Sequence, residues 1–206
     1  MDCGAGGGWG DYARGVFDPD GRHGAMALAS FMVPLGTPAP DFVLPDLDRR
    51  VYSRADFVGG PGLLVVFASN HCPYVRHVES VLGEVVDSLP MPAVAICSND
   101  VGISPDDAPI GLRDQAIRAG WTFPYLIDER QQVGRAFRAA CTPDFFLYDA
   151  NLTLAYRGAL DESTPGNGKP VTGKELRSAI EAVLDAAPVP EPHRPSMGCS
   201  IKWRES

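Results

Sequence analysis

A cysteine and a proline stand together where an apolar run gives way to a helical pattern, in the segment Ser69–Val75. The run Leu63–Phe67 is typical of a strand that is buried on both faces, and Pro73 suits the first position of a helix. Cys72 is therefore expected at a helix N-terminus, where free backbone N–H groups and the positive end of the helix dipole stabilise a thiolate. The thiolate is the nucleophilic form of cysteine, so the segment predicts an exposed, reactive sulfur with a lowered pKa. The alternative interpretation is a small buried residue that caps the helix.

A second proline follows a cysteine and a threonine, in Cys141-Thr142-Pro143, and an apolar strand pattern begins at Phe145. Proline tolerates a cis peptide bond far better than other residues do, so the bond before Pro143 is a candidate cis bond. A proline at this place also leaves strand backbone free to pair with a partner segment. The alternative is an ordinary trans proline at the entry of a strand.

Five cysteines are spread over the chain, at positions 3, 72, 97, 141 and 199. They are too sparse for a disulfide scaffold, and no two have metal-ligand spacing, so no bound metal is expected. Cys97 ends an apolar strand pattern and is predicted to be a core residue. Cys141 and Cys199 are both candidates for a thiol that pairs with Cys72. Cys141 shares the loop of the second proline, and Cys199 lies on an end of the chain that can fold back.

The pattern of apolar residues divides the chain into three parts. Residues 1–30 are expected to be a disordered tail, residues 31–187 form the predicted domain, and the proline-rich residues 188–206 form a C-terminal extension. Within the domain, a short N-terminal β-hairpin precedes alternating strands and helices, and a late β-hairpin precedes a closing helix. This order predicts an α/β fold with a central mixed sheet flanked by helices. Asp106 and Asp107 are interpreted as a surface turn.

The composition argues against several classes of function. The net charge is −8 and 45% of the residues are hydrophobic, which predicts an acidic globular chain without a nucleic-acid partner. No apolar run approaches the roughly 18 residues that a membrane helix needs, and the N-terminus lacks the pattern of a secretory signal. We therefore expect no membrane contact and a cytoplasmic location. No cofactor motif is found, so no cofactor is expected, and the oligomeric state is left open.

Four segments of the sequence match one known pattern: Thr37–Phe42, Asn70–Val75, Thr142–Pro143 and the C-terminal run Gly198–Trp203. The first three resemble the redoxin branch of the thioredoxin superfamily, which includes the alkyl hydroperoxide reductase and thiol-specific antioxidant proteins. More narrowly, the Asn70–Val75 segment and the C-terminal run resemble bacterial thioredoxin-like proteins with a single cysteine in an Asn-His-Cys-Pro-Tyr-Val segment. The resemblance implies a thioredoxin fold. It also implies that Cys72 is the attacking cysteine and that Pro143 is a cis-proline beside it. Thr142, His71 and Pro73 are the further residues expected to bind substrate.

Two departures from that branch bear on the mechanism. Val75 stands where ordinary thioredoxins have a second cysteine, so a thioredoxin-type reaction needs another resolving thiol. Compared with peroxiredoxins, Ser69 replaces a threonine, Val65 replaces a proline, and Pro143 occupies the position of the arginine that orients peroxide.

Three functions follow as hypotheses. The first is thiol–disulfide exchange with a protein or small-molecule partner, in which the Cys72 thiolate attacks and Cys141, Cys199 or an external thiol resolves the mixed disulfide. The second is a thiol peroxidase, in which Cys72 becomes a sulfenic acid that a thiol recycles. The third is a non-catalytic module that holds an extended peptide beside Pro143.

Overall fold

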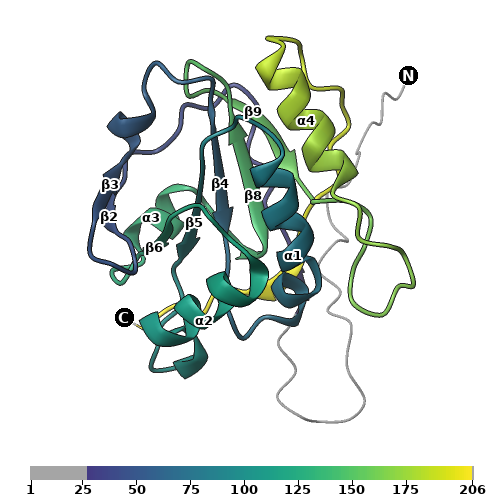
Figure 1. Ribbon diagram of the computed structural model, residues 1–206. Helices are drawn as coiled ribbons and strands as arrows, with labels where there is room; N and C mark the ends of the chain where they lie inside the picture. The colour runs from purple at the N-terminus through teal and green to yellow at the C-terminus, as the bar shows by residue number, and fades with distance from the viewer. Residues whose placement is uncertain (1–26, 206) are drawn as a thin grey trace, which may run out of the picture.

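The computed structural model describes residues 27–205, and a five-stranded mixed sheet lies at its centre (Figure 1). The strands follow the order β6 (Tyr125–Ile127), β5 (Ala93–Cys97), β4 (Leu63–Phe67), β8 (Asp144–Tyr148) and β9 (Leu154–Gly158). β4, β5 and β6 run parallel, whereas β8 is antiparallel to both β4 and β9. All five residues of β4 are completely buried, as a central strand with both faces covered requires.

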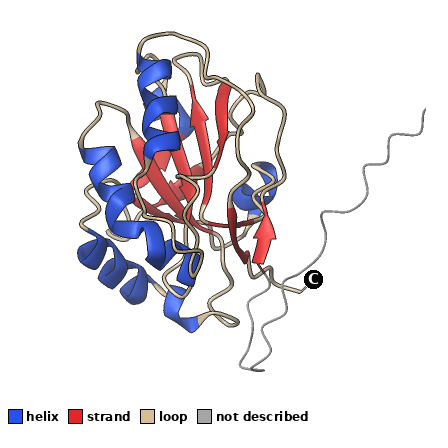
Figure 2. Ribbon diagram, turned by 90° about the vertical axis from the view of Figure 1, so that its right-hand side faces the viewer, coloured by secondary structure: helices blue, strands red, loops and turns tan. Residues whose placement is uncertain are grey.

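Helices and a hairpin cover the two faces of this sheet (Figure 2). One face packs against α1 (Pro73–Asp87), α2 (Pro109–Ala119) and α4 (Lys174–Leu184). The other face packs against α3 (Gln132–Ala136) and the region of the hairpin formed by β2 (Val43–Pro45) and β3 (Val51–Ser53). Two short 3₁₀ turns, Arg54–Phe57 and Pro105–Asp107, complete the elements. The predicted mixed sheet and N-terminal hairpin are therefore confirmed.

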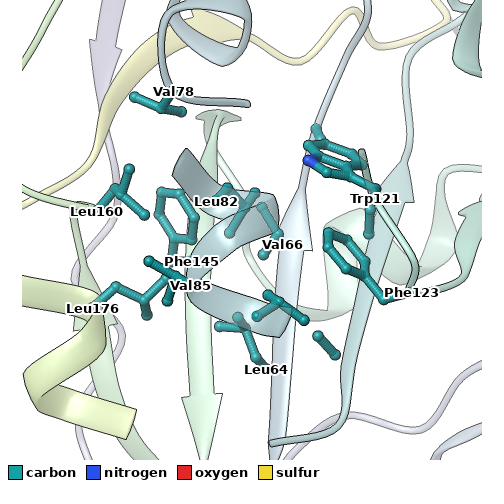
Figure 3. Close-up of a cluster of buried hydrophobic side chains, with 14 of the residues drawn as sticks. Leu64, Val66, Val78, Leu82, Val85, Trp121, Phe123, Phe145, Leu160 and Leu176 are labelled. Carbon is teal, nitrogen blue, oxygen red and sulfur yellow. The ribbon is translucent and has the colours of Figure 1, made fainter. Parts of the chain in front are cut away.

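The position of α1 is fixed by its apolar face. Val78, Leu82 and Val85 recur at helical spacing, and all three are buried over the sheet. Figure 3 shows these side chains among those of β4, β8 and α4, with Leu64, Val66, Phe145 and Leu176 labelled. Burying one such side chain contributes about 1.5–3 kcal/mol, so the packed face holds the N-terminus of α1 against the carboxyl end of β4.

A second, three-stranded sheet joins the two ends of the described chain. It has the order β1 (Ala27–Ala29), β10 (Met197–Ser200) and β7 (Cys141–Thr142), with both pairs antiparallel. In Figure 1 the yellow β10 lies beside the lower, N-terminal end of α1. The expected tail of residues 1–30 is thus too long at its end, because Ala27–Ala29 form a strand that pairs with β10. The rest of that expected tail lies outside the described residues. Within residues 27–205, none of the helices combines the length and apolarity needed to cross a bilayer.

Candidate active site

Cys72 occupies the position just before α1, with Pro73 as the first helical residue. Its backbone is extended (φ −75°, ψ 119°), which is the usual geometry for a residue that precedes a helix. The predicted placement of the sulfur at a helix N-terminus is therefore found in the structure. The expectation of an exposed sulfur is wrong, because Cys72 has 0% of its surface exposed. Neighbouring segments of the chain cover it.

The proline loop lies against this sulfur. The Cys72 thiol donates a hydrogen bond to the backbone oxygen of Thr142, with 3.0 Å between sulfur and oxygen. The peptide bond from Thr142 to Pro143 is cis, as the sequence predicted. Pro73 directly follows Cys72 in the helix, and Pro143 directly follows the threonine whose oxygen accepts the hydrogen bond of the Cys72 thiol.

Cys199 belongs to the same cluster. It lies directly opposite Thr142 in the antiparallel pair of β10 and β7. Its side chain lies near enough to Cys72 to lower the pKa of the Cys72 thiol, and Cys199 is itself 1% exposed. The backbone N–H of Tyr74, in the first turn of α1, points to the Cys199 sulfur. Both sulfurs thus share the N-terminus of one helix.

These surroundings favour a thiolate at Cys72 over one at Cys199. Burial opposes ionisation of Cys72, but the nearby side chains of Cys199 and Thr142 and the backbone N–H groups of Val75 and Cys199 lower its pKa to about 6. The nearby side chain of Cys72 and burial raise the pKa of Cys199. These shifts favour a thiolate at Cys72 and a protonated thiol at Cys199 near neutral pH.

The hydroxyl of Thr142 is a buried hydrogen-bond donor beside this cluster that has no partner among the described residues. Its oxygen is buried and has no hydrogen-bond partner of good geometry within the described chain. Nevertheless, the side chain lies near enough to the Cys72 sulfur to lower its pKa. The hydroxyl is thus free to turn toward a thiolate when the thiol loses its proton.

The other two described cysteines are arranged differently. Cys141 lies opposite Ser200, one residue from Thr142, so its side chain points to the other face of β7. Its thiol donates to the backbone oxygen of Pro143 at 3.6 Å, and burial raises its pKa well above the ordinary value. Cys97 is buried in the core, as predicted, and burial raises its pKa as well. The structure brings Cys199 to Cys72, and it gives Cys141 no contact with that sulfur among the hydrogen bonds described.

A buried carboxylate organises the strand-to-helix segment before Cys72. Asp107 is 2% exposed and accepts the backbone N–H of Asn70 at 2.6 Å and the side-chain amide of Asn99 at 2.7 Å. Its other contacts are the Ser69 hydroxyl at 3.0 Å and the Nδ1 atom of His71 at 2.8 Å. The interpretation of Asp106 and Asp107 as a surface turn is therefore wrong for Asp107. The sequence does contain a signal for this site, because polar residues follow both β4 and β5. Once buried, their hydrogen-bond donors need an acceptor, and Asp107 provides it.

His71 is held next to the sulfur by this carboxylate. The hydrogen bond to Asp107 raises the pKa of His71, and the charges of Asp107 and of the Cys72 thiolate act in the same direction, while burial opposes them. Burial would raise the pKa of Asp107, but the hydrogen bonds from His71 and Asn99 lower it. His71 therefore keeps its proton at pH values where a free histidine is already neutral, and the Asp107 carboxylate balances its charge.

Peroxiredoxins use an arginine to orient peroxide, but within the described residues no arginine forms a hydrogen bond with Cys72. The described chain has a completely buried arginine, Arg157, but its guanidinium forms an ion pair with Asp144 at 3.0 Å and also contacts the backbone oxygens of Phe31 and Arg138. It supports the proline loop from behind. Within residues 27–205 no group of three or more His, Cys, Asp or Glu side chains is placed to hold a metal ion.

The family model described as the AhpC/TSA family matches residues 35–157. The chain belongs to the AhpC/TSA family. The matched segment contains Cys72, Cys141 and Pro143 and stops before Cys199, so the second sulfur of the cluster comes from outside it.

The chain is also similar to curated and solved proteins. The thiol-disulfide oxidoreductase ResA of Geobacillus thermodenitrificans is 31% identical over 119 residues, which are 58% of this chain and 66% of that protein. The match thus spans slightly less than two thirds of the curated relative. An uncharacterized conserved protein from Geobacillus kaustophilus is 44% identical, with a TM-score of 0.86 over 89% of this chain and 99% of that chain. A hypothetical protein from Sinorhizobium meliloti is 42% identical, with a TM-score of 0.84 over 86% and 99%.

More distant structures show the fold alone. A putative thiol:disulfide interchange protein DsbE from Chlorobium tepidum is 20% identical and has a TM-score of 0.55 over 74% of this chain and 99% of that chain. Together with the mixed sheet and its flanking helices, these likenesses confirm the predicted thioredoxin fold.

Proposed function

We propose that the protein is a thiol–disulfide oxidoreductase whose redox centre is the pair Cys72 and Cys199. The observation that carries the proposal is the meeting of the two sulfurs at the N-terminus of α1, beside the cis-proline loop. The likeness to a curated thiol-disulfide oxidoreductase supports it. Cys199 supplies from the C-terminal end the thiol that Val75 cannot supply three residues after Cys72.

The reaction begins at Cys72, because its pKa is the lowered one. Its thiolate attacks one sulfur of a substrate disulfide, the S–S bond breaks, and a mixed disulfide with Cys72 forms. Cys199 then attacks the Cys72 sulfur and gives its proton to the second leaving thiolate. The substrate disulfide gains two electrons and becomes two thiols, and the protein dithiol becomes a Cys72–Cys199 disulfide. An external dithiol must reduce that disulfide before the next turnover.

The experiment is disulfide mapping with matched cysteine variants. The reduced protein is treated with a small excess of a disulfide reagent, remaining thiols are alkylated, and the bridged peptides are found by mass spectrometry. We expect a Cys72–Cys199 bridge in the wild-type protein and in Cys141→Ser. In Cys199→Ser we expect a stable mixed disulfide at Cys72. A Cys72–Cys141 bridge, or a Cys72 that no reagent modifies, would exclude this assignment.

A peroxidase is the second candidate, and the family assignment favours keeping it. It predicts that hydrogen peroxide converts Cys72 to a sulfenic acid. The Cys199 thiol then condenses with this sulfenic acid, which gives the same internal disulfide and releases water. The rates separate the two functions. We expect the disulfide reagent to oxidise the pair much faster than peroxide at equal concentration, because no arginine contacts the Cys72 sulfur among the described hydrogen bonds.

A further inference from the structure

The edge of β7 beside Pro143 is already filled by the chain's own C-terminal strand. β10 pairs with it in antiparallel register, Cys199 opposite Thr142 and Ser200 opposite Cys141. The other edge of β10 pairs with β1, where Ala27 lies opposite Cys199. A cis-proline loop of this kind offers backbone groups to an extended partner, but here β10 takes those groups. This geometry disfavours the hypothesis of a module that holds a foreign peptide beside Pro143.

The fit of β10 against the loop requires a glycine. A Cβ atom at Gly198 would lie 2.0 Å from the backbone oxygen of Thr142 and 2.5 Å from its carbonyl carbon. Both are backbone atoms, so no side-chain movement can relieve the clash. Gly198 therefore lets the strand approach the proline loop, and this approach places Cys199 over Cys72.

Hydrogen bonds and an aromatic contact hold the segment after β10 in place. The backbone N–H of Lys202 donates to the side-chain oxygen of Asn99 at 2.8 Å, and its carbonyl accepts from Asp100 N at 2.9 Å and from the side chain of Gln131 at 2.8 Å. The ring of Trp203 lies under the guanidinium of Arg135, 4.5 Å from ring centre to carbon. These contacts hold the segment after β10 in place and so limit how far β10 can move from the loop.

We propose that β10 makes the Cys72–Cys199 pair selective for low-molecular-weight disulfides over disulfides in extended polypeptides. This inference rests on the thiol–disulfide function proposed above. Because Cys72 is 0% exposed, either substrate needs the cover over its sulfur to open, and a small disulfide needs only enough room for one of its own sulfurs. A polypeptide disulfide must also lay its backbone beside Thr142, where β10 already lies. The chemical step is the same for both substrates: the Cys72 thiolate displaces one thiolate from the substrate, and a Cys72 mixed disulfide forms.

The test uses the full chain in a Cys199→Ser background, so that mixed disulfides at Cys72 accumulate. Oxidised 2-mercaptoethanol is the small probe, and insulin is the polypeptide probe; the rate of adduct formation at Cys72 is followed by mass spectrometry. We expect the small probe to react at least tenfold faster than insulin. Adding Gly198→Ala should reduce this preference at least fivefold by raising the insulin rate. Adding Met197→Ala, on the same strand without a clash, should leave the preference unchanged.

The outcomes separate the two proposals. If neither probe forms an adduct at Cys72, the thiol–disulfide function fails. If adducts form but insulin reacts as fast as the small probe before Gly198 is changed, the selectivity inference is overturned and the function stands. Should Gly198→Ala prevent folding, Trp203→Ala in the same background weakens the fastening of the strand and should shift the preference in the same direction. An unchanged preference in that variant also overturns the inference.

Discussion

Thr142 and Cys199 face each other across the pair of β7 and β10, and the backbone oxygen of Thr142 accepts the hydrogen bond of the Cys72 thiol at 3.0 Å. One residue of the proline loop thus positions both sulfurs of the proposed redox pair. In ordinary thioredoxins the second sulfur follows the first by one helical turn. In this chain it arrives from the opposite end of the sequence, and the register of a short sheet sets its position.

Removal of the Cys199 thiol should raise the pKa of Cys72. The thiol of Cys199 is the largest of the contributions that lower it. In the wild-type protein the thiolate fraction should be half-maximal at about pH 6, since that is the value to which the surroundings lower the pKa. A hydrogen bond to a charged group is worth about 1.5–3 kcal/mol, so Cys199→Ala should move this midpoint upward by about one pH unit or more.

Ultraviolet absorbance of the thiolate measures this midpoint. The titration is made in a Cys3→Ser background, so that the cysteine outside the described residues adds no signal. Cys141→Ala is the matched control, because its thiol donates to the Pro143 oxygen and its removal should leave the midpoint in place. An equal shift in both variants would show that Cys199 has no special relationship to Cys72.

Replacement of Thr142 by valine should lower the free energy of unfolding only at pH values where Cys72 is ionised. The hydroxyl has no well-formed partner while Cys72 is a thiol, so its loss should leave the free energy of unfolding at pH 5 nearly unchanged. The Cys72 pKa lies below its ordinary value of 9.0, so ionisation stabilises the fold as the pH rises above about 6. Thr142→Val should raise that pKa and remove part of this stabilisation.

Denaturant unfolding at pH 5 and pH 8 tests the Thr142 prediction. The expected result is a loss of about 1 kcal/mol at pH 8 and little change at pH 5. A similar loss at both pH values would mean that the hydroxyl has only a packing role. Thr142→Ser is the rescue variant, because it keeps the donor while it removes the methyl group.

The sequence was informative where local patterns determine structure, and uninformative where distant segments meet. Cys72 and Pro73 at the start of a helix, and the cis bond before Pro143, follow from residue types in short segments. The burial of Cys72 and its proximity to Cys199 depend on the path of the C-terminal segment. That path is determined by the pairing of β10 with β1 and β7, which links residues at opposite ends of the chain. Asp107 was misread for the same reason, since its hydrogen-bond donors lie in other segments.

The Asp107–His71 pair should make stability depend on pH in a definite direction. The pKa of His71 is raised above 6.5 in the folded protein, so the pair stabilises the fold fully below the unfolded value of 6.5. The stabilisation is lost as the pH rises through the higher folded pKa. His71→Asn should therefore lower the free energy of unfolding by about 1–3 kcal/mol at pH 5.5 and by much less at pH 9.

The free energies of unfolding of the wild-type protein and of His71→Asn are compared at each pH. Contributions from other titrating groups largely cancel in this difference, which isolates the contribution of His71. His193→Asn is a matched control, since that histidine packs against Tyr156 away from the site. A destabilisation by His71→Asn that is equal at pH 5.5 and pH 9 would show that the hydrogen bond, and not the charge, is what matters.

The buried ion pair behind the proline loop should be sensitive to loss of one partner. Arg157 and Asp144 are both completely buried and lie 3.0 Å apart. Burial raises the pKa of Asp144 to about 6 even with the opposing guanidinium in place. Arg157→Met leaves that carboxyl without its partner, which costs about 3–5 kcal/mol for a buried pair. The variant raises the Asp144 pKa further, and a raised carboxyl pKa means that stability falls as the pH rises toward it.

The loss of stability in Arg157→Met should therefore be larger at pH 8 than at pH 5, as measured by denaturant unfolding. Addition of Asp144→Leu removes the buried charge and should recover part of the loss, because a matched apolar pair avoids the cost of burying two ions. Recovery should be accompanied by an altered Cys72 pKa, since Asp144 directly follows Pro143 and accepts the backbone N–H of Ala140 at 3.2 Å. If the double variant is no more stable than the single one, Asp144 supports the loop through its hydrogen bond to Ala140 and not through its charge.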